Sequence, residues 1–381
     1  MSAETRKRIV ISPDSFKGSL RACDVALAIK RGVDNACLGF ETVCLPVSDG
    51  GEGTLDSIIE KNSFKIVTVT GPEKKKVNAR YGILGDTAVI EMAEAAGLEL
   101  TANSRRAATA TTYGVGELIA SALDDGFRKI TITAGGSATN DGGCGMASAL
   151  GIRFIDEAGH DFIPVGSSLR KIRNIDISGM DKRLLSCSIT VATDITNPMI
   201  GMSGATAVYA PQKGILPGDI DIMEEGMVCL AGHLEYMCGK KISDIPGTGA
   251  AGGLAAPLIA FAGASITSGI DMVLDAVGFD QYLSGDTVCV ITGEGRIDSQ
   301  SFSGKALSGI VRRSCASGIP VYCICGSFIG DRYKMKSSGI SEIKAITDIS
   351  PDLESAIRNA AEYIEKLAMD LALDIRPESF F

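Results

Sequence analysis

Hydrophobic residues along this chain alternate between short continuous runs and helical periods. Residues 8–12 (RIVIS) form an apolar run of strand length, and Val25, Ile29 and Val33 then recur at the spacing of one helix face. A second apolar run covers 42–47. Short continuous runs of this kind suit strands that are buried on both faces of a parallel sheet. The opening therefore predicts a strand, a helix and a second strand in succession.

The same plan returns further along the chain. A helix is expected over VGELIASALDDG, ending at Gly126, and the strand KITITA follows it. Strands are expected again at DTVCVIT and VYCICG, with the helix ALSGIVRRSCASG between them. The last helical period runs through SPDLESAIRNAAEYIEKLAMDLAL, with Ser350 as its expected N-cap and Pro351 in its first turn.

Between these regular blocks the pattern changes, because 66–104 resembles strands and turns and 151–284 mixes elements with little regularity. We therefore predict an α/β protein in which a doubly wound parallel-sheet domain is interrupted by a second, mixed α/β domain. The first domain is expected to comprise 1–65, 105–150 and 285–381. The inserted domain is expected to comprise 66–104 and 151–284.

Composition narrows the range of partners and locations. The 381 residues carry 37 Lys and Arg against 46 Asp and Glu, so the formal net charge is −9. An acidic surface repels nucleic acid and anionic membranes, and we expect neither as a partner. The apolar stretch 249–264 is too short and too rich in glycine to span a bilayer, and the N-terminus does not resemble a signal peptide. The 11 cysteines show no metal-site spacing and suit a reducing compartment, so we expect a cytoplasmic protein.

Three expected strands end in glycine-rich acidic loops, at 48–54 (SDGGEGT), 135–143 (GGSATNDGG) and 292–298 (TGEGRID). Parallel α/β sheets place ligand sites at the carboxyl ends of their strands, so these loops are candidates to converge. Glycine lets backbone N–H groups approach a ligand closely, and such groups suit phosphate oxygens. Carboxylates beside a phosphate repel it unless a cation lies between them, so the acids in these loops suggest a Mg²⁺–nucleotide site.

The charged residues of these and related strand exits are the candidates for chemistry. The acids are Asp14, Asp49, Glu52, Asp141, Asp194, Glu294 and Asp298. A turn or helix-capping role explains any single one of them. The basic residues are Lys17, Arg296 and Lys305. Arg296 lies between two acids in the sequence and also suits a structural ion pair.

Several common site patterns are missing from the sequence. No G-x-x-x-x-G-K-[ST] or G-x-S-x-G occurs, which argues against a Walker-type nucleotide loop and an ordinary hydrolase nucleophile. The sequence has only two histidines, His160 and His233, so a His-based triad or a zinc site is not expected. GTGAAG (247–252) matches the dinucleotide pattern by letter, but the preceding KKISDIP is a poor strand, so we interpret the match as coincidental.

Longer motifs resemble a known family. PDSFKGSL, DGGEGT, IEMAEAAGL, TTYGVGELI, GGSATNDGG, TNP with GATAVYAPQKG, and TGEGRIDSQSFSGK together resemble the glycerate kinase type 1 family, in order, from about residue 8 to about residue 330. The small departures are Ser12 and Ser48, where alanine is expected. The resemblance implies an ATP-dependent kinase that converts D-glycerate to 2-phosphoglycerate, with 3-phosphoglycerate as the less favoured product, and releases ADP. It also implies two α/β domains, one of them Rossmann- or flavodoxin-like.

Under this resemblance, each candidate residue receives a provisional role, because phosphoryl transfer depends mainly on positioning and charge neutralisation. The ATP phosphates are expected on Gly135, Gly136 and Ser137, with Asn140 and Asp141 nearby. Mg²⁺ is expected to take carboxylates from Asp49, Asp194 or Asp298. The glycerate is expected to contact Ser15, Lys17, Asp49 and Arg296. Catalysis is expected to use Lys17 and Arg296 for the developing charge and Asp194, in preference to Asp298, as the base.

Other functions remain open from the residues alone. The same loops would serve a kinase of another small hydroxy acid, which only the shape of the pocket would distinguish. A non-enzymatic regulator that binds a sugar acid or a nucleotide is a second alternative, and an oxidoreductase based on GTGAAG is a third. The expected partners are glycerate and ATP, and a homodimer is possible.

Overall fold

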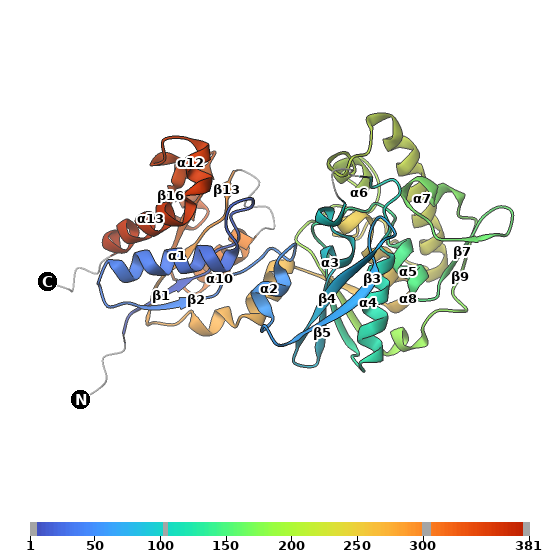
Figure 1. The fold of residues 1–381 in the computed structure, drawn as a ribbon, viewed down its shortest axis with the longest axis horizontal. Helices are drawn as coiled ribbons and strands as arrows, with labels where there is room; N and C mark the ends of the chain where they lie inside the picture. Colours follow the sequence, from blue (N-terminus) through green and yellow to red (C-terminus); the bar gives the residue numbers. More distant parts are fainter. Residues whose placement is uncertain (1–5, 102–105, 299–305, 376–381) are drawn as a thin grey trace. The chain divides into compact units, whose positions relative to one another are not determined.

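The computed structural model describes residues 6–101, 106–298 and 306–375. The chain divides into two compact units (Figure 1). Residues 1–49 and 270–381 form the first unit, and residues 50–269 form the second. The second unit is therefore an insertion between the two segments of the first.

The first unit contains a sheet of five strands, all parallel, in the order β2–β1–β12–β14–β16. This is the 2-1-3-4-5 order of flavodoxin-like folds, and its switch point lies between β1 and β12. The strands are β1 (Arg8–Ile11), β2 (Glu41–Cys44), β12 (Thr287–Thr292), β14 (Val321–Cys325) and β16 (Ile340–Ala345). The apolar runs of β1, β12 and β14 are buried as the sequence predicts, whereas β2, at the edge of the sheet, is only partly buried.

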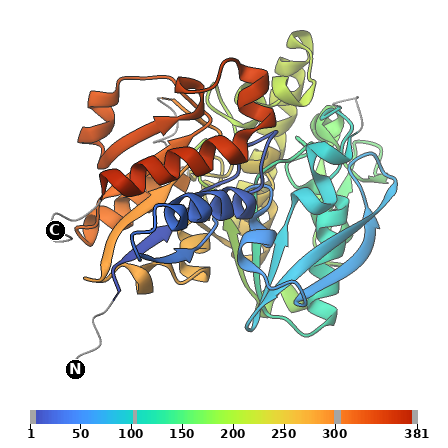
Figure 2. The same cartoon turned by 60° about the vertical axis from the view of Figure 1, so that its left-hand side comes forward.

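Helices α1 (Ala22–Asn35) and α13 (Ala360–Asp374) lie side by side in the first unit (Figures 1 and 2). Gly32 permits this contact, because a Cβ atom there would lie 2.2 Å from the Glu365 carbonyl oxygen. Right-handed crossovers on the two sides of the switch point place α1 and α10 on opposite faces of the sheet. The remaining elements are α9 (Gly269–Ala276), α10 (Ala306–Ala316), α11 (Arg332–Ser337), α12 (Leu353–Arg358), β13 (Arg296–Ile297) and β15 (Ser327–Phe328).

The C-terminal helical period differs from its prediction in two respects. It forms two helices, α12 and α13, separated at Asn359. The N-cap of α12 is Asp352, whose carboxylate accepts a 2.7 Å hydrogen bond from the Ser355 amide. The expectation that Ser350 is the N-cap is therefore wrong, because the helix begins two residues later and an equally good capping residue stands there.

The second unit contains a mixed sheet of six strands in the order β11–β10–β6–β5–β4–β3. The four strands from β5 to β11 are parallel, and β4 is antiparallel to both β3 and β5. These strands are β3 (Phe64–Thr70), β4 (Lys76–Leu84), β5 (Thr87–Glu91), β6 (Lys129–Thr133), β10 (Ser188–Ala192) and β11 (Ser265–Thr267). A small sheet in the order β8–β7–β9 is formed by β7 (Arg153–Ile155), β8 (Asp161–Phe162) and β9 (Asn174–Asp176).

Within the described residues, five α-helices contribute residues to the hydrophobic core of the second unit. They are α3 (Ala93–Ala96), α4 (Tyr113–Asp124), α5 (Cys144–Ala149), α7 (Ile220–Cys238) and α8 (Ala255–Ala262). The unit also contains α2 (Thr54–Ile58) and α6 (Ala205–Tyr209). With one all-parallel sheet and one mixed sheet in an inserted unit, the predicted fold class is confirmed.

The boundaries between the units lie elsewhere than the sequence pattern suggested. Strand β6 pairs with β5 and β10, so the segment 105–150 belongs to the second unit and not to the first. Residues 50–65 also belong to the second unit, and 270–284 belong to the first. A strand–helix alternation reports local structure but does not reveal which of two sheets a strand joins.

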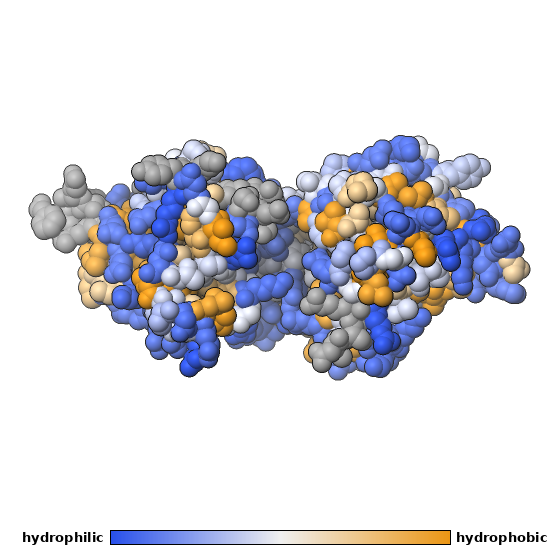
Figure 3. Space-filling view, turned by 90° about the horizontal axis from the view of Figure 1, so that it is seen from above, coloured by the Kyte–Doolittle hydropathy of each residue, from blue (hydrophilic) through white to orange (hydrophobic). Residues whose placement is uncertain are grey.

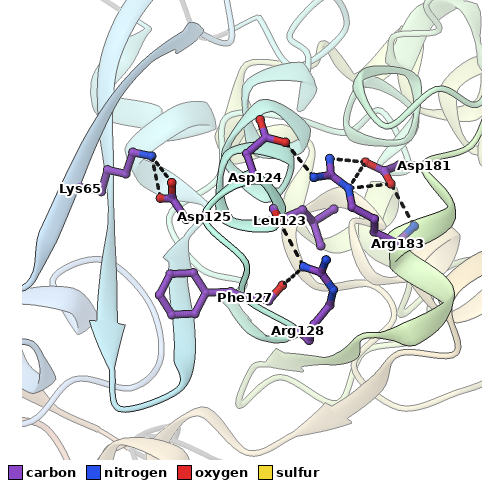
Figure 4. A network of polar contacts seen from close by, with 8 residues as sticks. All are labelled: Lys65, Leu123, Asp124, Asp125, Phe127, Arg128, Asp181 and Arg183. Atoms are coloured by element: carbon purple, nitrogen blue, oxygen red, sulfur yellow. Dashed lines mark hydrogen bonds and ion pairs between the residues drawn. The ribbon is translucent and has the colours of Figure 1, made fainter.

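Polar contacts anchor the C-terminal end of α4 (Figure 4). Asp125 forms a 2.6 Å ion pair with Lys65 of β3, and Asp124 forms a 2.8 Å ion pair with Arg183. The Arg128 side chain donates a 2.7 Å hydrogen bond to the carbonyl of Phe127. These contacts lie where β6 begins, at the opposite end of that strand from the glycine-rich loop that follows it.

The surface is of mixed character. On the face shown in Figure 3, hydrophobic residues form small groups among hydrophilic ones. Among the helices of the described segments, none combines the length and the apolar character needed to cross a membrane.

Candidate active site

In the first unit, the loops after β1 and β12 pack against each other at the switch point. The Asp14 amide donates a 2.8 Å hydrogen bond to the Gly293 carbonyl oxygen. A Cβ atom on Gly295 would lie 3.2 Å from the backbone nitrogen of Lys17. The missing side chain at Gly295 therefore lets the two loops approach each other closely. Ligands of open α/β sheets bind at this position, outside the carboxyl ends of the strands.

Asp14 is the acid most affected by this environment. One of its carboxylate oxygens accepts a 2.5 Å hydrogen bond from the Ser15 amide. Burial, together with the nearby carboxylates of Asp49 and Glu294, raises the pKa of Asp14 to about 7. The sequence identified Asp14 only as one strand-exit acid among several. Its position directly after β1, at the switch point, is the signal that would have ranked it higher.

The other predicted residues of the first unit follow β1, β2 and β12. Ser15 and Asp49 are half-buried, and Lys17 is exposed. The exposed Arg296 forms a 3.3 Å ion pair with Asp298, in agreement with the structural role that the sequence left open for it. Lys305 lies outside the described residues.

In the second unit, the loop after β6 presents backbone at its surface. Gly135 is half-buried and Gly136 is exposed, with a φ of +66° that favours glycine. A Cβ atom on Gly135 would lie 2.4 Å from the Cα atom of Gly51, so this turn lies directly against the DGGEG segment. Gly51 and the Gly135–Gly136 turn, which both belong to this unit, are therefore in direct contact.

Glu91, the last residue of β5, holds the DGGEG segment in place. Its carboxylate oxygens accept hydrogen bonds of 2.9 Å from the Gly53 amide and 3.0 Å from the Leu55 amide. Burial raises the pKa of Glu91 to about 7. Glu91 was not among the residues predicted from the sequence, although it ends an apolar strand within the IEMAEAAGL motif.

The side chains of Asn140 and Asp141 point into the unit. Both residues are fully buried. Asp141 accepts 2.8 Å hydrogen bonds from the Thr112 amide and hydroxyl, and 3.2 Å hydrogen bonds from the amides of Gly143 and Gly145. Burial raises the pKa of Asp141. These hydrogen bonds indicate that Asp141 stabilises the conformation of the loop from the interior of the unit.

Lys213 was not among the residues predicted from the sequence. It belongs to the short 3₁₀ helix Pro211–Lys213 and is only 4% exposed. Its Nζ atom donates hydrogen bonds of 2.7 Å to the Ser137 hydroxyl and 2.8 Å to the Thr139 carbonyl oxygen. The only signal in the sequence was the motif GATAVYAPQKG, to which no role was attached.

Asp194 follows β10, the strand between β6 and β11. It is half-buried and accepts a 2.8 Å hydrogen bond from the Ser268 hydroxyl. The Ala134 amide donates a 2.9 Å hydrogen bond to the Ala192 carbonyl oxygen, which keeps the ends of β6 and β10 level. Asp194 and the Gly135–Gly136 turn therefore leave neighbouring strands at the same edge of one sheet.

The three glycine-rich loops do not follow strands of a single sheet. The loop 135–143 follows β6 in the second unit, 292–298 follows β12 in the first, and 48–54 crosses the boundary between the units. Among the described residues, no group of three or more His, Cys, Asp or Glu side chains is arranged to hold a metal ion.

Comparisons with known proteins assign these features to one family. The profile of the Glycerate kinase family matches residues 9–376. A glycerate kinase of Bacillus subtilis (strain 168) is 43% identical over 374 residues, which cover 97% of this chain and 98% of that protein. The glycerate 2-kinase of Escherichia coli (strain K12) is 42% identical over 370 residues, which cover 96% of this chain and 97% of that protein.

A solved structure agrees with these relatives. The crystal structure of a glycerate kinase 2 candidate from Salmonella typhimurium LT2 is 40% identical in sequence, with a TM-score of 0.83. The match covers 99% of this chain and 100% of that one. The chain belongs to the glycerate kinase family and is a phosphotransferase with an alcohol group as acceptor.

Proposed function

We propose that this glycerate kinase, as a member of the type 1 group, transfers the γ-phosphoryl group of ATP to the 2-hydroxyl group of D-glycerate. The products are 2-phosphoglycerate and ADP. Family membership over nearly the whole chain supports the activity. The observation that carries the proposal within the molecule is the Gly135–Gly136 turn, with Gly136 exposed, beside Asp194 at the carboxyl ends of two neighbouring parallel strands.

The turn after β6 binds the ATP phosphates through its backbone. Hydrogen bonds from the Leu98 amide to the Gly136 carbonyl oxygen and from the Ala138 amide to the Ala96 carbonyl oxygen, both 2.9 Å, fix the turn on both sides. In the described part of the chain, the amides of Gly136 and Ser137 donate no backbone hydrogen bond. Such amides, held in place before a ligand arrives, suit phosphate oxygens. Asn140 and Asp141 support this turn from inside the unit.

Asp194 accepts the proton of the glycerate hydroxyl group. The Ser268 hydroxyl donates a 2.8 Å hydrogen bond to its carboxylate and orients it. Asp194 also leaves the strand next to the one that carries the Gly135–Gly136 turn, at the same edge of the sheet. This position beside the proposed phosphate-binding turn favours Asp194 over Asp298 as the base.

Lys17 and Arg296, with Ser15 and Asp49, recognise the glycerate and neutralise the charge that develops on the transferred group. Both cations are exposed beside the loops at the switch point of the first unit. A guanidinium group binds a carboxylate with two parallel hydrogen bonds, which makes Arg296 suited to the acid group of the substrate.

Mg²⁺ fits these residues as part of a complex with the nucleotide. Mg²⁺ is usually held by one or two carboxylates together with phosphate oxygens and water, so it does not need a ready cluster of protein ligands. Asp49, Asp194 or Asp298 would supply the carboxylates. When bound, the ion would neutralise charge on the phosphates of ATP.

Two further features belong to the proposal. All 11 cysteines are free thiols, which supports a location in the reducing cytoplasm.

A homodimer is the proposed assembly, and light scattering of the purified protein tests it.

The test of the function is ADP release by the purified protein with Mg²⁺, ATP and D-glycerate. We expect release to depend on glycerate, with lactate and tartronate as poorer acceptors. Phosphorus NMR of the product then distinguishes 2-phosphoglycerate from 3-phosphoglycerate. Equal ADP release with and without glycerate would reject the proposal.

A further inference from the structure

A buried ammonium group lies beneath the turn after β6. Lys213 is 4% exposed, and its two hydrogen-bond acceptors, the Ser137 hydroxyl and the Thr139 carbonyl oxygen, are both uncharged. Both acceptors belong to the loop 135–143. In the described segments, Lys213 forms no ion pair with a carboxylate. Its positive charge is therefore held under this loop without a directly bound counter-charge.

This arrangement is costly in a free protein. Removing an ammonium group from water carries a large penalty unless a carboxylate pairs with it. Asp141 is the acidic group that acts on Lys213, but its oxygens already accept hydrogen bonds from Thr112, Gly143 and Gly145. Burial accordingly lowers the pKa of Lys213 to about 7. Packing alone would be served better by an apolar side chain of the same length.

The segment that carries Lys213 is built to hold this position. The 3₁₀ helix Pro211–Lys213 ends at Gly214, whose φ is +86°, and the Ala107 amide donates a 3.2 Å hydrogen bond to the Lys213 carbonyl oxygen. A second contact from the same part of the chain joins the Asn140 amide group to the Thr206 hydroxyl at 3.1 Å. The GATAVYAPQKG motif thus supports the loop 135–143 at two separate points.

We propose that Lys213 is a positioning residue for the nucleotide. Its ammonium group fixes Ser137 and Thr139, so that the amides of the Gly136–Ser137 turn are held ready for phosphate oxygens, and its charge attracts the anion to that turn. The inference rests on the proposed function, since it takes the ligand of this turn to be the polyphosphate of ATP. The charge that lacks a counter-ion in the free protein acquires one when the nucleotide binds.

The test compares Lys213→Met with Lys129→Met. The first variant removes the buried charge at similar side-chain length. The second removes an exposed lysine, paired with Asp86, from the beginning of β6 in the same unit. Binding of a non-hydrolysable ATP analogue with Mg²⁺, without glycerate, is measured by calorimetry. We expect affinity to fall about 10-fold or more in Lys213→Met, as for loss of a charge-assisted contact, and to be unchanged in Lys129→Met.

Two further readouts separate this role from packing. The unfolding temperature of Lys213→Met should equal or exceed that of the wild type, because a buried methionine carries no desolvation cost. Wild-type affinity for the analogue should weaken as pH rises through about 7, where the ammonium group loses its proton, and the variant should show no such change. In turnover, KM for ATP should rise while KM for glycerate changes by less than about 2-fold.

Each outcome of these measurements either supports or overturns the role of Lys213. Wild-type nucleotide affinity in Lys213→Met overturns the inference, as does a loss of stability with equal rises in both KM values. Should Lys213→Met not fold, Ser137→Ala removes one acceptor, and unchanged affinity there would reject the role. A wild-type protein that binds no nucleotide overturns this inference and the proposed function together. Weaker binding in Lys213→Met, with no glycerate-dependent ADP release by the wild type, would reject only the proposed reaction.

Discussion

The Ser268 hydroxyl group donates a 2.8 Å hydrogen bond to the Asp194 carboxylate and joins the loops that follow β11 and β10. These strands are parallel neighbours, and Thr267 pairs with Ala192 at their ends. The contact orients the carboxylate at the edge of the sheet. A carboxylate held in this way suits the role of a positioned general base.

The Asp194→Asn substitution tests that role. An amide keeps the shape and the contact with Ser268 but cannot take a proton. We expect kcat to fall by about 10²–10⁴-fold, the usual contribution of a positioned base, with the affinity for glycerate and ATP largely kept. Steady-state kinetics of the two substrates measures both quantities.

The matched control is Asp86→Asn, which changes an exposed carboxylate that is paired with Lys129 at the beginning of β6. It should retain wild-type kinetics. Ser268→Ala leaves the Asp194 carboxylate in place and should cost much less activity than Asp194→Asn. A near-normal kcat in Asp194→Asn would remove Asp194 from the role and direct attention to Asp298.

The buried Glu91 predicts a pH dependence of stability. Its pKa is raised by burial from 4.5 to about 7, so the folded protein binds more protons than the unfolded chain between these values. Stability from this group is therefore present at low pH and declines as pH rises from about 4.5 to about 7. The slope cannot exceed about 1.4 kcal/mol per pH unit for one group.

Denaturant unfolding of wild type and Glu91→Gln across this range measures the effect. Glutamine does not titrate, so the difference in unfolding free energy between the two proteins should shift toward the variant as pH rises. Asp14 titrates in the same range, but it is present in both proteins and cancels in the difference. A difference that stays constant from pH 4.5 to 7 would show that Glu91 is ionised throughout.

The sequence predicted the elements of this fold better than their assembly. The apolar runs of β1, β12 and β14 located buried parallel strands, because a strand buried on both faces requires such runs. Strand β6 follows the same pattern but pairs with β5 and β10 in the inserted unit. Pairing of distant strands depends on tertiary packing, for which a local hydrophobic pattern contains no signal.

For the candidate site, the sequence indicated the loop but not the orientation of its side chains. Glycine-rich strand exits pointed to Gly135 and Gly136, which the structure places at the surface of one loop. The same motif also suggested Asn140 and Asp141 as neighbours of the nucleotide, yet their side chains are fully buried. Loop composition does not specify which side chains turn inward, and a lysine 70 residues or more away in sequence, Lys213, supports the loop from beneath.

Arg296 predicts a specific loss of substrate recognition. Arg296→Met removes the guanidinium group from an exposed residue, so the fold should be little affected. We expect KM for glycerate to rise by about 10-fold or more, as for loss of a charge-assisted carboxylate contact, with a smaller change in KM for ATP. Arg312→Met is the matched control, since Arg312 is an exposed arginine of α10 paired with Asp271. Equal KM values in wild type and Arg296→Met would leave Lys17 as the candidate.

Removal of divalent ions should abolish activity without unfolding the protein. The described residues hold no cluster of three metal-ligand side chains, so the free protein should not depend on Mg²⁺ for stability. We expect EDTA to stop ADP release and to leave the unfolding temperature of the nucleotide-free protein unchanged. Added Mg²⁺ should restore the activity. A fall in unfolding temperature with EDTA alone would instead indicate a structural metal site.

Substitution of Gly135 or Gly136 by alanine should destabilise the protein, for a different reason at each position. A methyl group on Gly135 would meet the Cα atom of Gly51 at 2.4 Å, so Gly135→Ala must separate two backbone segments. At Gly136 the nearest atom would be the Cβ atom of Ala93 at 3.4 Å, and the cost is mainly that of a φ of +66°. We expect losses of stability of about 1–3 kcal/mol for the first from overpacking and about 1–2 kcal/mol for the second from the left-handed backbone conformation.

The same two substitutions distinguish an effect on nucleotide binding from an effect on the stability of the unit. Because Gly135→Ala displaces the turn from the DGGEG segment, it should weaken binding of the ATP analogue more than Gly136→Ala does. Gly85→Ala is a suitable control, since it also has a positive φ, of +60°, with open space around the added methyl group and no part in the glycine-rich loops. Calorimetric titration and thermal unfolding of the three variants give both rankings. If Gly136→Ala proved the more harmful to binding, the critical feature would be the backbone conformation at Gly136 and not the contact with Gly51.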